Sequence, residues 1–252
     1  MPRIYCGVWQ RALLEGDGLT TDRNSTVLWL QTPVWHGDLR LPSPRPNFSE
    51  AIRFNDCTST QIRWLALQQG FSGITQVSDD KCQWLRDVDF QPHRGSRDVG
   101  RMVFIENSRV LEEYGVEADY HETWIRLPEG DGPCACWERK NLKTHGIERL
   151  LIAGDCFFLV KDRASSLPKP DNGRYPNLCN LIFQRADKAS VWLDLTLAFG
   201  RIDCGPRPWQ IAHATLPWLE GRSLADLGLG AHSEWTAQLQ ETGAPVPPFK
   251  AD

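Results

Sequence analysis

The segment from Val34 to Leu41 carries side chains that could do acid–base chemistry. Alternate residues of a strand face the same side, so His36, Asp38 and Arg40 would share one face. Histidine can take up a proton near neutral pH, aspartate can orient the imidazole, and arginine can bind an anion or an enolate. If this face lines a cavity, the three residues form a catalytic row. If it faces outward, they form an ordinary solvated strand, and alternation alone does not distinguish the two.

A second group of candidate residues surrounds Trp124. Tyr120 and Glu122 share its strand face. Burial beside indole rings raises the pKa of a carboxyl group, and an arginine partner lowers it. Arg86, on the face of Trp84, is the candidate partner. Glu122 is therefore either an acid or base, or one half of a buried ion pair that only stabilises the fold.

Tryptophan is the most distinctive feature of the composition, with 11 Trp against two Met in 252 residues. Its rigid indole suits both a packed core and the wall of a ligand cavity. We predict that a cavity would be formed by aromatic residues and anchoring arginines, namely Trp29, Arg40, Trp84, Arg86, Tyr120 and Trp124. His36, Asp38 and Glu122 are the candidate catalytic residues.

Several standard catalytic signatures are absent from the sequence. It has no G-x-S-x-G elbow, no G-x-x-x-x-G-K-[ST] loop, no H-E-x-x-H pair and no dinucleotide-binding glycine turn. This argues against classical hydrolases, nucleotide-dependent enzymes and zinc proteases, and we expect no cofactor. A cofactor-independent lyase, isomerase or cyclase is compatible with it, because such an enzyme needs only a shaped pocket and one or two titratable groups.

The eight cysteines favour reduced thiols over a metal site. Cys134 and Cys136 form a C-x-C pair, with His145 and Cys156 as the nearest helpers. Structural zinc usually needs two ligand pairs at C-x₂₋₄-C spacing, so we predict no metal. The first residues lack the apolar segment of a secretory signal, which favours a cytoplasmic protein with mostly buried thiols.

Charge and hydropathy argue against two classes of partner, leaving the small hydrophobic or aromatic ligand expected from the barrel. The net charge is −4, and the 28 basic residues are spread along the chain without a Lys/Arg run. A protein that follows a phosphate backbone needs such a run, so we expect no nucleic acid. No apolar stretch is long enough for a membrane helix, so we expect no membrane partner. The sequence carries no indication of the oligomeric state.

Short apolar runs separated by Gly, Pro, Asn and Asp predict an all-β sandwich or barrel. One helix is expected over residues 61–69, capped near Thr58 and ended by Gly70. We expect strands over residues 25–32, 34–41, 81–90, 101–105, 119–127, 149–160, 178–184, 190–199 and 209–216.

Two segments of the sequence resemble each other. Residues 5–11 and 120–126 both read Y-x-x-x-W-x-R, and each is followed by Gly-Asp-Gly. Trp84 and Trp209 each stand eight residues before a proline. Correspondences in the same order predict a duplication. We therefore expect two domains, residues 1–117 and 118–252.

The Gly7-Val8-Trp9 strand resembles the start of calycin (lipocalin-like) barrels. In that superfamily the tryptophan plugs one end of the barrel and an arginine packs on its ring, a cation–π contact. We expect the pairs Trp9 with Arg11 and Trp124 with Arg126. In the second segment, Glu122 stands where the signature has glycine.

A narrower similarity is to the Hri family of fungal proteins. It is carried by residues 25–30 (STVLWL), 37–40 (GDLR) and 119–126 (DYHETWIR), mostly in the first half and at the junction. The resemblance implies two tandem calycin-like β-barrel domains with one or two short helices. It implies no established catalytic residues.

Three functions follow from these observations. The leading hypothesis is a protein that binds a small apolar molecule or aromatic acid in a barrel lumen. The second is a cofactor-independent enzyme acting on such a molecule. The third is an interaction scaffold whose barrels are filled by side chains.

Overall fold

The computed structural model describes residues 1–16, 18, 20–92, 95–141, 146–168, 177–203, 205–206 and 208–250. Asp17 of the first Gly-Asp-Gly segment and the candidate metal helper His145 lie outside the described residues, as does Cys204.

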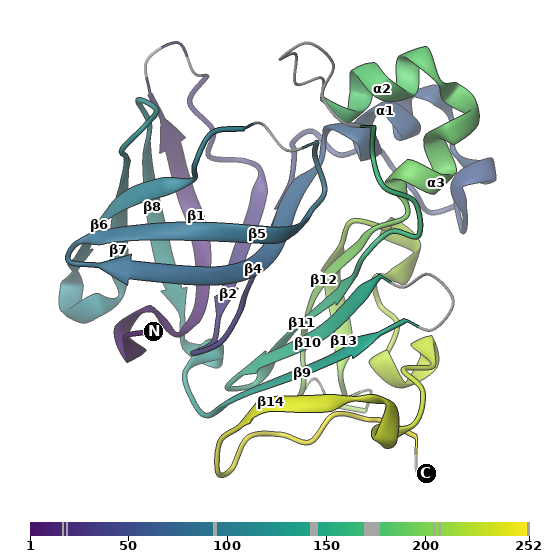
Figure 1. The fold of residues 1–252 in the computed structure, drawn as a ribbon. Coiled ribbons are helices and arrows are strands. Elements are labelled where there is room, and N and C mark those ends of the chain that lie inside the picture. The colour runs from purple at the N-terminus through teal and green to yellow at the C-terminus, as the bar shows by residue number, and fades with distance from the viewer. Residues whose placement is uncertain are drawn as a thin grey trace.

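The first half of the chain forms a closed, eight-stranded antiparallel barrel (Figure 1). Strands follow one another around it in chain order, and the last strand closes against the first. The strands are β1 (Gly7–Glu15), β2 (Thr26–Gln31), β3 (His36–Leu41), β4 (Gln69–Ser78), β5 (Lys81–Asp89), β6 (Val99–Ile105), β7 (Val110–Gly115) and β8 (His121–Leu127). The predicted lipocalin-like barrel is therefore present once.

The second half forms an open, six-stranded antiparallel sheet, so the expected second barrel is wrong. One face of this sheet packs on the barrel, and a separate aromatic core containing Trp209 and Trp235 covers the other. With both faces covered, no lumen remains. The order is β13 (Gln210–Ala214), β12 (Thr196–Arg201), β11 (Cys156–Lys161), β10 (Ile147–Ala153), β9 (Cys134–Lys140) and β14 (Thr236–Gln240).

The two similar Y-x-x-x-W-x-R segments are neighbours in one barrel. They lie on β1 and β8, where Trp9 stands opposite Arg126 and Arg11 stands opposite Trp124. They therefore do not open two separate barrels. Since β8 completes the barrel, the expected boundary between residues 117 and 118 falls before its last strand. A division into two domains stays a prediction.

Three α-helices, α1 (Ser59–Leu67), α2 (Leu178–Gln184) and α3 (Ala189–Leu193), gather at one end of the molecule (Figure 1). The helix α1 was expected, and Thr58 and Gln61 form its capping box. The strands predicted over 178–184 and at 190–193 are wrong. Asn177 caps α2 by accepting from the Asn180 amide, and the buried residues of α2 are spaced for one helical face, namely Leu178, Leu181 and Ile182.

Single-turn 3-10 helices connect these elements. They are η1 (Arg3–Tyr5), η2 (Phe54–Asp56), η3 (Glu106–Ser108), η4 (Pro128–Gly130), η5 (Ala186–Lys188), η6 (Pro217–Leu219), η7 (Leu224–Leu227) and η8 (His232–Glu234). In the part of the chain that the structure describes, no helix is long and apolar enough to cross a membrane.

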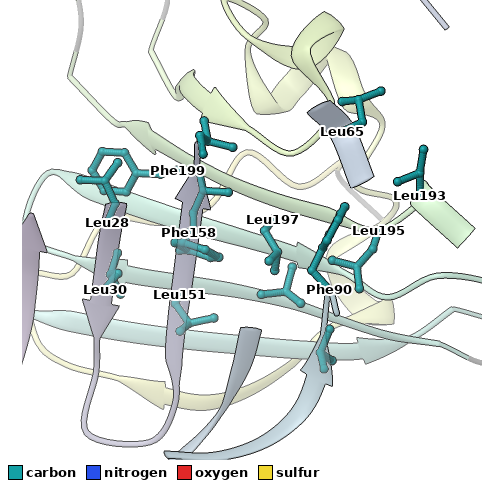
Figure 2. Close-up of a cluster of buried hydrophobic side chains, with 14 of the residues drawn as sticks. Leu28, Leu30, Leu65, Phe90, Leu151, Phe158, Leu193, Leu195, Leu197 and Phe199 are labelled. Carbon is teal, nitrogen blue, oxygen red and sulfur yellow. The ribbon is translucent and has the colours of Figure 1, made fainter. Parts of the chain in front are cut away.

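The barrel and the sheet share one apolar core (Figure 2). On β2, Leu28 and Leu30 face the sheet, whereas Trp29 between them belongs to the cluster inside the barrel. From the sheet, Leu151 and Phe158 pack into the same core. The approach is close, since a β-carbon at position 37, a glycine on β3, would lie 2.5 Å from the Phe158 ring.

A buried arginine also joins the two parts. Arg149 of β10 donates to both carboxylate oxygens of Asp87 on β5, at 2.6 and 2.5 Å. Its guanidinium lies 4.5 Å from the Trp35 ring centroid. Arg149 thus adds to the apolar contacts that hold the barrel against the sheet. The side chains of β2 and β3 that face the sheet pack in the shared core, and those on the other face of each strand point into the barrel.

Candidate functional site

One end of the barrel is closed by Trp9. This side chain is fully buried, and its indole N–H donates to the Tyr5 carbonyl oxygen at 2.9 Å. The Arg126 guanidinium lies 4.3 Å from the Trp9 ring centroid and donates to the carbonyl oxygens of Cys6 and Ile4. The tryptophan plug with its arginine is therefore present, but the arginine comes from the neighbouring strand β8.

The pairs expected within each strand are wrong. Arg11 instead forms ion pairs with Asp22 and Glu122, both at 2.6 Å. Side chains two residues apart on one strand point the same way but stand about 7 Å apart. A residue directly opposite on the neighbouring strand is closer.

Replacing Arg126 with methionine should lower the free energy of unfolding by about 2 kcal/mol. The reason is that three carbonyl oxygens at the closed end, those of Ile4, Cys6 and Ser108, lose a charged donor. Urea unfolding measures this difference. Arg109→Met, at an exposed position near the same end, is the matched control and should change stability by less than about 0.5 kcal/mol. Equal effects of the two substitutions would contradict the plug.

The other end of the barrel opens into a cavity of about 650 Å³. Residues from all eight strands line it, together with the chain between β5 and β6. The inner face of β3 is therefore the polar one, which alternation could not decide. Eight of the nine predicted site residues line this cavity: Trp29, Asp38, Arg40, Trp84, Arg86, Tyr120, Glu122 and Trp124.

The ninth, His36, is not among the lining residues. It is fully buried deeper in the barrel, where its Nδ1 lies 2.9 Å from the Thr75 hydroxyl. Burial, with the positive charges of Arg86 and Arg149, lowers the pKa of His36 to about 3. The ring is therefore neutral at physiological pH and has no contact with the cavity, so its role as a base stays a prediction without structural support.

Asp38, Arg40 and Glu122 form one network with Arg11. Arg40 donates to both oxygens of Asp38, at 2.8 and 3.2 Å, and its Nη1 lies 3.5 Å from Glu122 Oε1. The same Glu122 oxygen accepts from Arg11 at 2.6 Å. The partners of Glu122 are thus Arg11 and Arg40, and the expected pairing with Arg86 is wrong.

Arg86 of β5 also belongs to the cavity wall. It pairs with Asp89 at 3.2 Å and with Asp98, and its guanidinium lies 3.5 Å from the Phe71 ring centroid. Asp98 belongs to the segment between β5 and β6 that lines the cavity, whereas His93 and Arg94 of that segment lie outside the described residues.

Glu113 is a lining residue that the sequence analysis missed. It lies on β7, is 3% exposed, and stands directly opposite Glu122 on β8. The Tyr120 hydroxyl donates to one of its oxygens at 2.7 Å, and the Trp124 indole N–H donates to the other at 3.0 Å. Burial and the charge of Glu122 raise the pKa of Glu113 to about 8, so this carboxyl can exchange a proton near neutral pH.

The cysteines form no metal site in the described part of the chain, where no group of three or more His, Cys, Asp or Glu side chains is placed to hold an ion. The seven described cysteines are free, and five of them are buried. Cys134 and Cys136 lie in the core between barrel and sheet, away from the cavity.

Comparison with known proteins yields structural likenesses only. No protein family and no curated protein matches the sequence. The uncharacterized protein YLR301w from Saccharomyces cerevisiae matches with a TM-score of 0.50 at 7% identity, over 82% of this chain and 84% of that one. A lipocalin-like protein from Bacteroides uniformis matches with a TM-score of 0.31 at 8% identity, over 49% of this chain and 99% of that one.

The likeness to YLR301w shows a shared fold and nothing about activity. Membership of the Hri family stays a prediction. The fold that this resemblance implied is present in its first half, as one closed antiparallel barrel with a tryptophan plug.

Proposed function

We propose that this protein binds a small, partly aromatic molecule in the open end of its barrel. The observation that carries the proposal is the cavity of about 650 Å³. Pockets for small ligands commonly measure about 300–1,000 Å³, and an eight-stranded barrel has room for one such molecule.

The composition of the wall supports this proposal. Trp29 lies at the centre of an indole cluster, with the Trp84 and Trp124 ring centroids 5.7 and 5.9 Å away in edge-on geometry. All three line the cavity, and polar groups such as Glu113 and Arg40 stand beside them. Apolar walls with a few fixed polar groups are typical of sites that bind and orient a small molecule.

Binding should appear as saturable quenching of tryptophan fluorescence by a panel of indole and naphthalene compounds. A cavity-filling variant, Leu14→Phe, should weaken binding at least about tenfold, because Leu14 lines the cavity. The matched control is Leu67→Phe on α1, where the side chain is 44% exposed. No saturation across the panel, or equal affinities of the two variants, would overturn the proposal.

One observation favours catalysis as a second candidate function. Glu113 is buried, lines the cavity and has a pKa raised to about 8, which suits a general acid or base. A cofactor-independent isomerase or lyase could use it where the sequence had indicated His36, Asp38 or Glu122. Deuterium uptake from D₂O into a bound ligand, lost in Glu113→Gln, would support this candidate.

The scaffold hypothesis required barrels filled by side chains, and the open cavity speaks against it. A cytoplasmic location, the absence of a cofactor and the absence of nucleic-acid or membrane partners remain predictions from the sequence.

A further inference from the structure

We infer that the cavity selects a cation, and that its ligand is an aromatic or aliphatic amine whose ammonium group lies beside Glu113 and Glu122. This inference rests on the proposed function, since it names the class of ligand for the same cavity. It differs from the sequence-based expectation of an acid held by Arg40 and Arg86.

The first support is the balance of charged groups in the wall. Among the described lining residues, carboxyl groups outnumber guanidinium groups by two to one. The acidic residues are Asp38, Asp89, Asp98, Glu113, Glu117 and Glu122, and the basic ones are Arg40, Arg86 and Arg97.

Each of these arginines is already paired within the protein. Arg40 binds Asp38 and Glu122, Arg86 binds Asp89 and Asp98, and Arg97 binds Glu117. An anionic ligand would therefore find no described guanidinium without a carboxylate partner, and it would face the excess of negative charge.

Glu113 and Glu122 are, with Asp38, the least exposed carboxyl groups of the wall. They are 3% and 2% exposed and lie directly opposite each other on β7 and β8. If both were ionised, their like charges would destabilise the sheet, and a buried Glu113 carboxylate would be costly without a charged partner. Among the described residues Glu113 has no ion-pair partner. An ammonium group would offset both effects with its charge and its three N–H donors.

Two polar groups without hydrogen-bond partners among the described residues belong to side chains that line the cavity. Glu122 Oε1 accepts from Arg11 and lies near Arg40, whereas its Oε2 has no hydrogen-bond partner among the described residues. The indole N–H of Trp84 also lacks one there, although the side chain is only 7% exposed. Both side chains line the cavity. The free carboxylate oxygen suits an ammonium donor, and the indole N–H suits a hydroxyl or carbonyl oxygen on the same ligand.

The indole walls favour a cation as well. Trp124 and Trp29 line the cavity next to the two glutamates, and the faces of indole rings attract cations. Trp124 already has the Arg40 guanidinium 6.0 Å from its ring centroid. An aromatic amine could therefore place its ring among the indoles and its ammonium group at the carboxylates.

Amine binding should be linked to a proton. The groups that face Glu113 come from several elements. They are Glu122 from β8, Tyr120 just before β8, Asp98 from the segment before β6, Arg40 from β3 and Cys82 from β5. Burial and Glu122 keep Glu113 protonated in the free protein near pH 7. An ammonium group favours its carboxylate form, so binding should release a proton, and affinity should rise towards pH 8.

The test uses three probes of one shape on the full chain: tryptamine, indole-3-propionic acid and 3-ethylindole. Isothermal titration near pH 8 should show tryptamine binding at least about tenfold more tightly than either other probe. Glu113→Gln should reduce tryptamine affinity about tenfold and leave the affinity for the uncharged 3-ethylindole unchanged. It should also abolish proton release on tryptamine binding, which is measured by repeating the titration in buffers of different ionisation enthalpy. Glu50→Gln, at an exposed position outside the barrel, should leave all three affinities unchanged.

The outcomes separate this inference from the proposed function. Binding of 3-ethylindole or the acid as tight as that of tryptamine would overturn the amine preference and leave the binding function standing. Tryptamine affinity unchanged in both Glu113→Gln and Glu122→Gln would also overturn it, provided that circular dichroism shows both variants folded. Failure of all three probes to bind at millimolar concentration would overturn the binding function together with the inference.

Discussion

Replacing Phe158 with alanine should destabilise the barrel and the sheet together, by about 3–5 kcal/mol. Phe158 belongs to β11 of the sheet, is fully buried, and packs in the shared core with Leu28 and Leu30 of the barrel (Figure 2). Its removal leaves a cavity that the close backbone at Gly37 cannot fill. Urea unfolding gives the total change, and hydrogen exchange resolved by peptide reports the barrel and sheet strands separately.

The matched control is Phe183→Ala on α2. Phe183 is 91% exposed, so its removal should change stability by less than about 0.5 kcal/mol. If Phe158→Ala speeds hydrogen exchange only in the sheet strands and leaves the exchange rates of β1–β8 unchanged, the two parts fold independently. The shared core would then not be the link that holds the barrel.

The pH dependence of stability should change strongly when Glu113 is replaced by glutamine. The folded protein holds the Glu113 proton with a pKa of about 8, against 4.5 for the unaffected group. The unfolded chain therefore loses this proton first as pH rises, and the contribution of Glu113 to stability falls between these two values. One pKa unit corresponds to about 1.4 kcal/mol, so we expect a loss of about 2–4 kcal/mol that the variant does not show.

The measurement is the free energy of unfolding of wild type and Glu113→Gln across this pH range. The glutamine can still accept the Trp124 indole hydrogen bond, so the difference between the curves reports the ionisation. The exposed Glu50→Gln variant should follow the wild-type curve. Parallel curves for wild type and Glu113→Gln would mean that Glu113 is an ordinary ionised carboxylate.

The sequence indicated eight of the residues that line the cavity, and strand alternation explains why. Strand alternation placed Asp38 with Arg40, and Glu122 with Trp124, and in the structure these faces turn inward. Alternation gives the face but not the depth. His36 shares the face of Asp38, yet it lies deeper, against Thr75 and outside the lining.

Glu113 could not be found by the same reasoning. It lies in the segment VLEEYG, where Leu111 and Glu113 are buried and Glu112 between them is half-buried. Because the two adjacent glutamates are both polar, the sequence shows no alternation of apolar and polar residues at this point. The strand β7 was therefore not predicted. The like-charge pair with Glu122 depends on which strands are neighbours, and that information is not contained in either segment alone.

Strand pairing also explains the error about the second barrel. Trp9 and Trp124 lie on the adjacent strands β1 and β8 of one closed barrel, where Trp9 closes one end and Trp124 lines the cavity at the other. Arg126 of β8 packs on the Trp9 ring. Sequence similarity between two strands is compatible with both a duplication and such a pair. The segment 178–184 shows a related ambiguity, since a short apolar run does not distinguish a strand from a helix.

The most direct test of a ligand-binding barrel is a crystal structure of the protein grown with tryptamine. We expect ligand density in the open end of the barrel, with the ring beside Trp29 and Trp124 and the amino group within hydrogen-bonding distance of Glu113 or Glu122. A lumen that is closed by side chains, or a ligand found only on the outer surface, would contradict it.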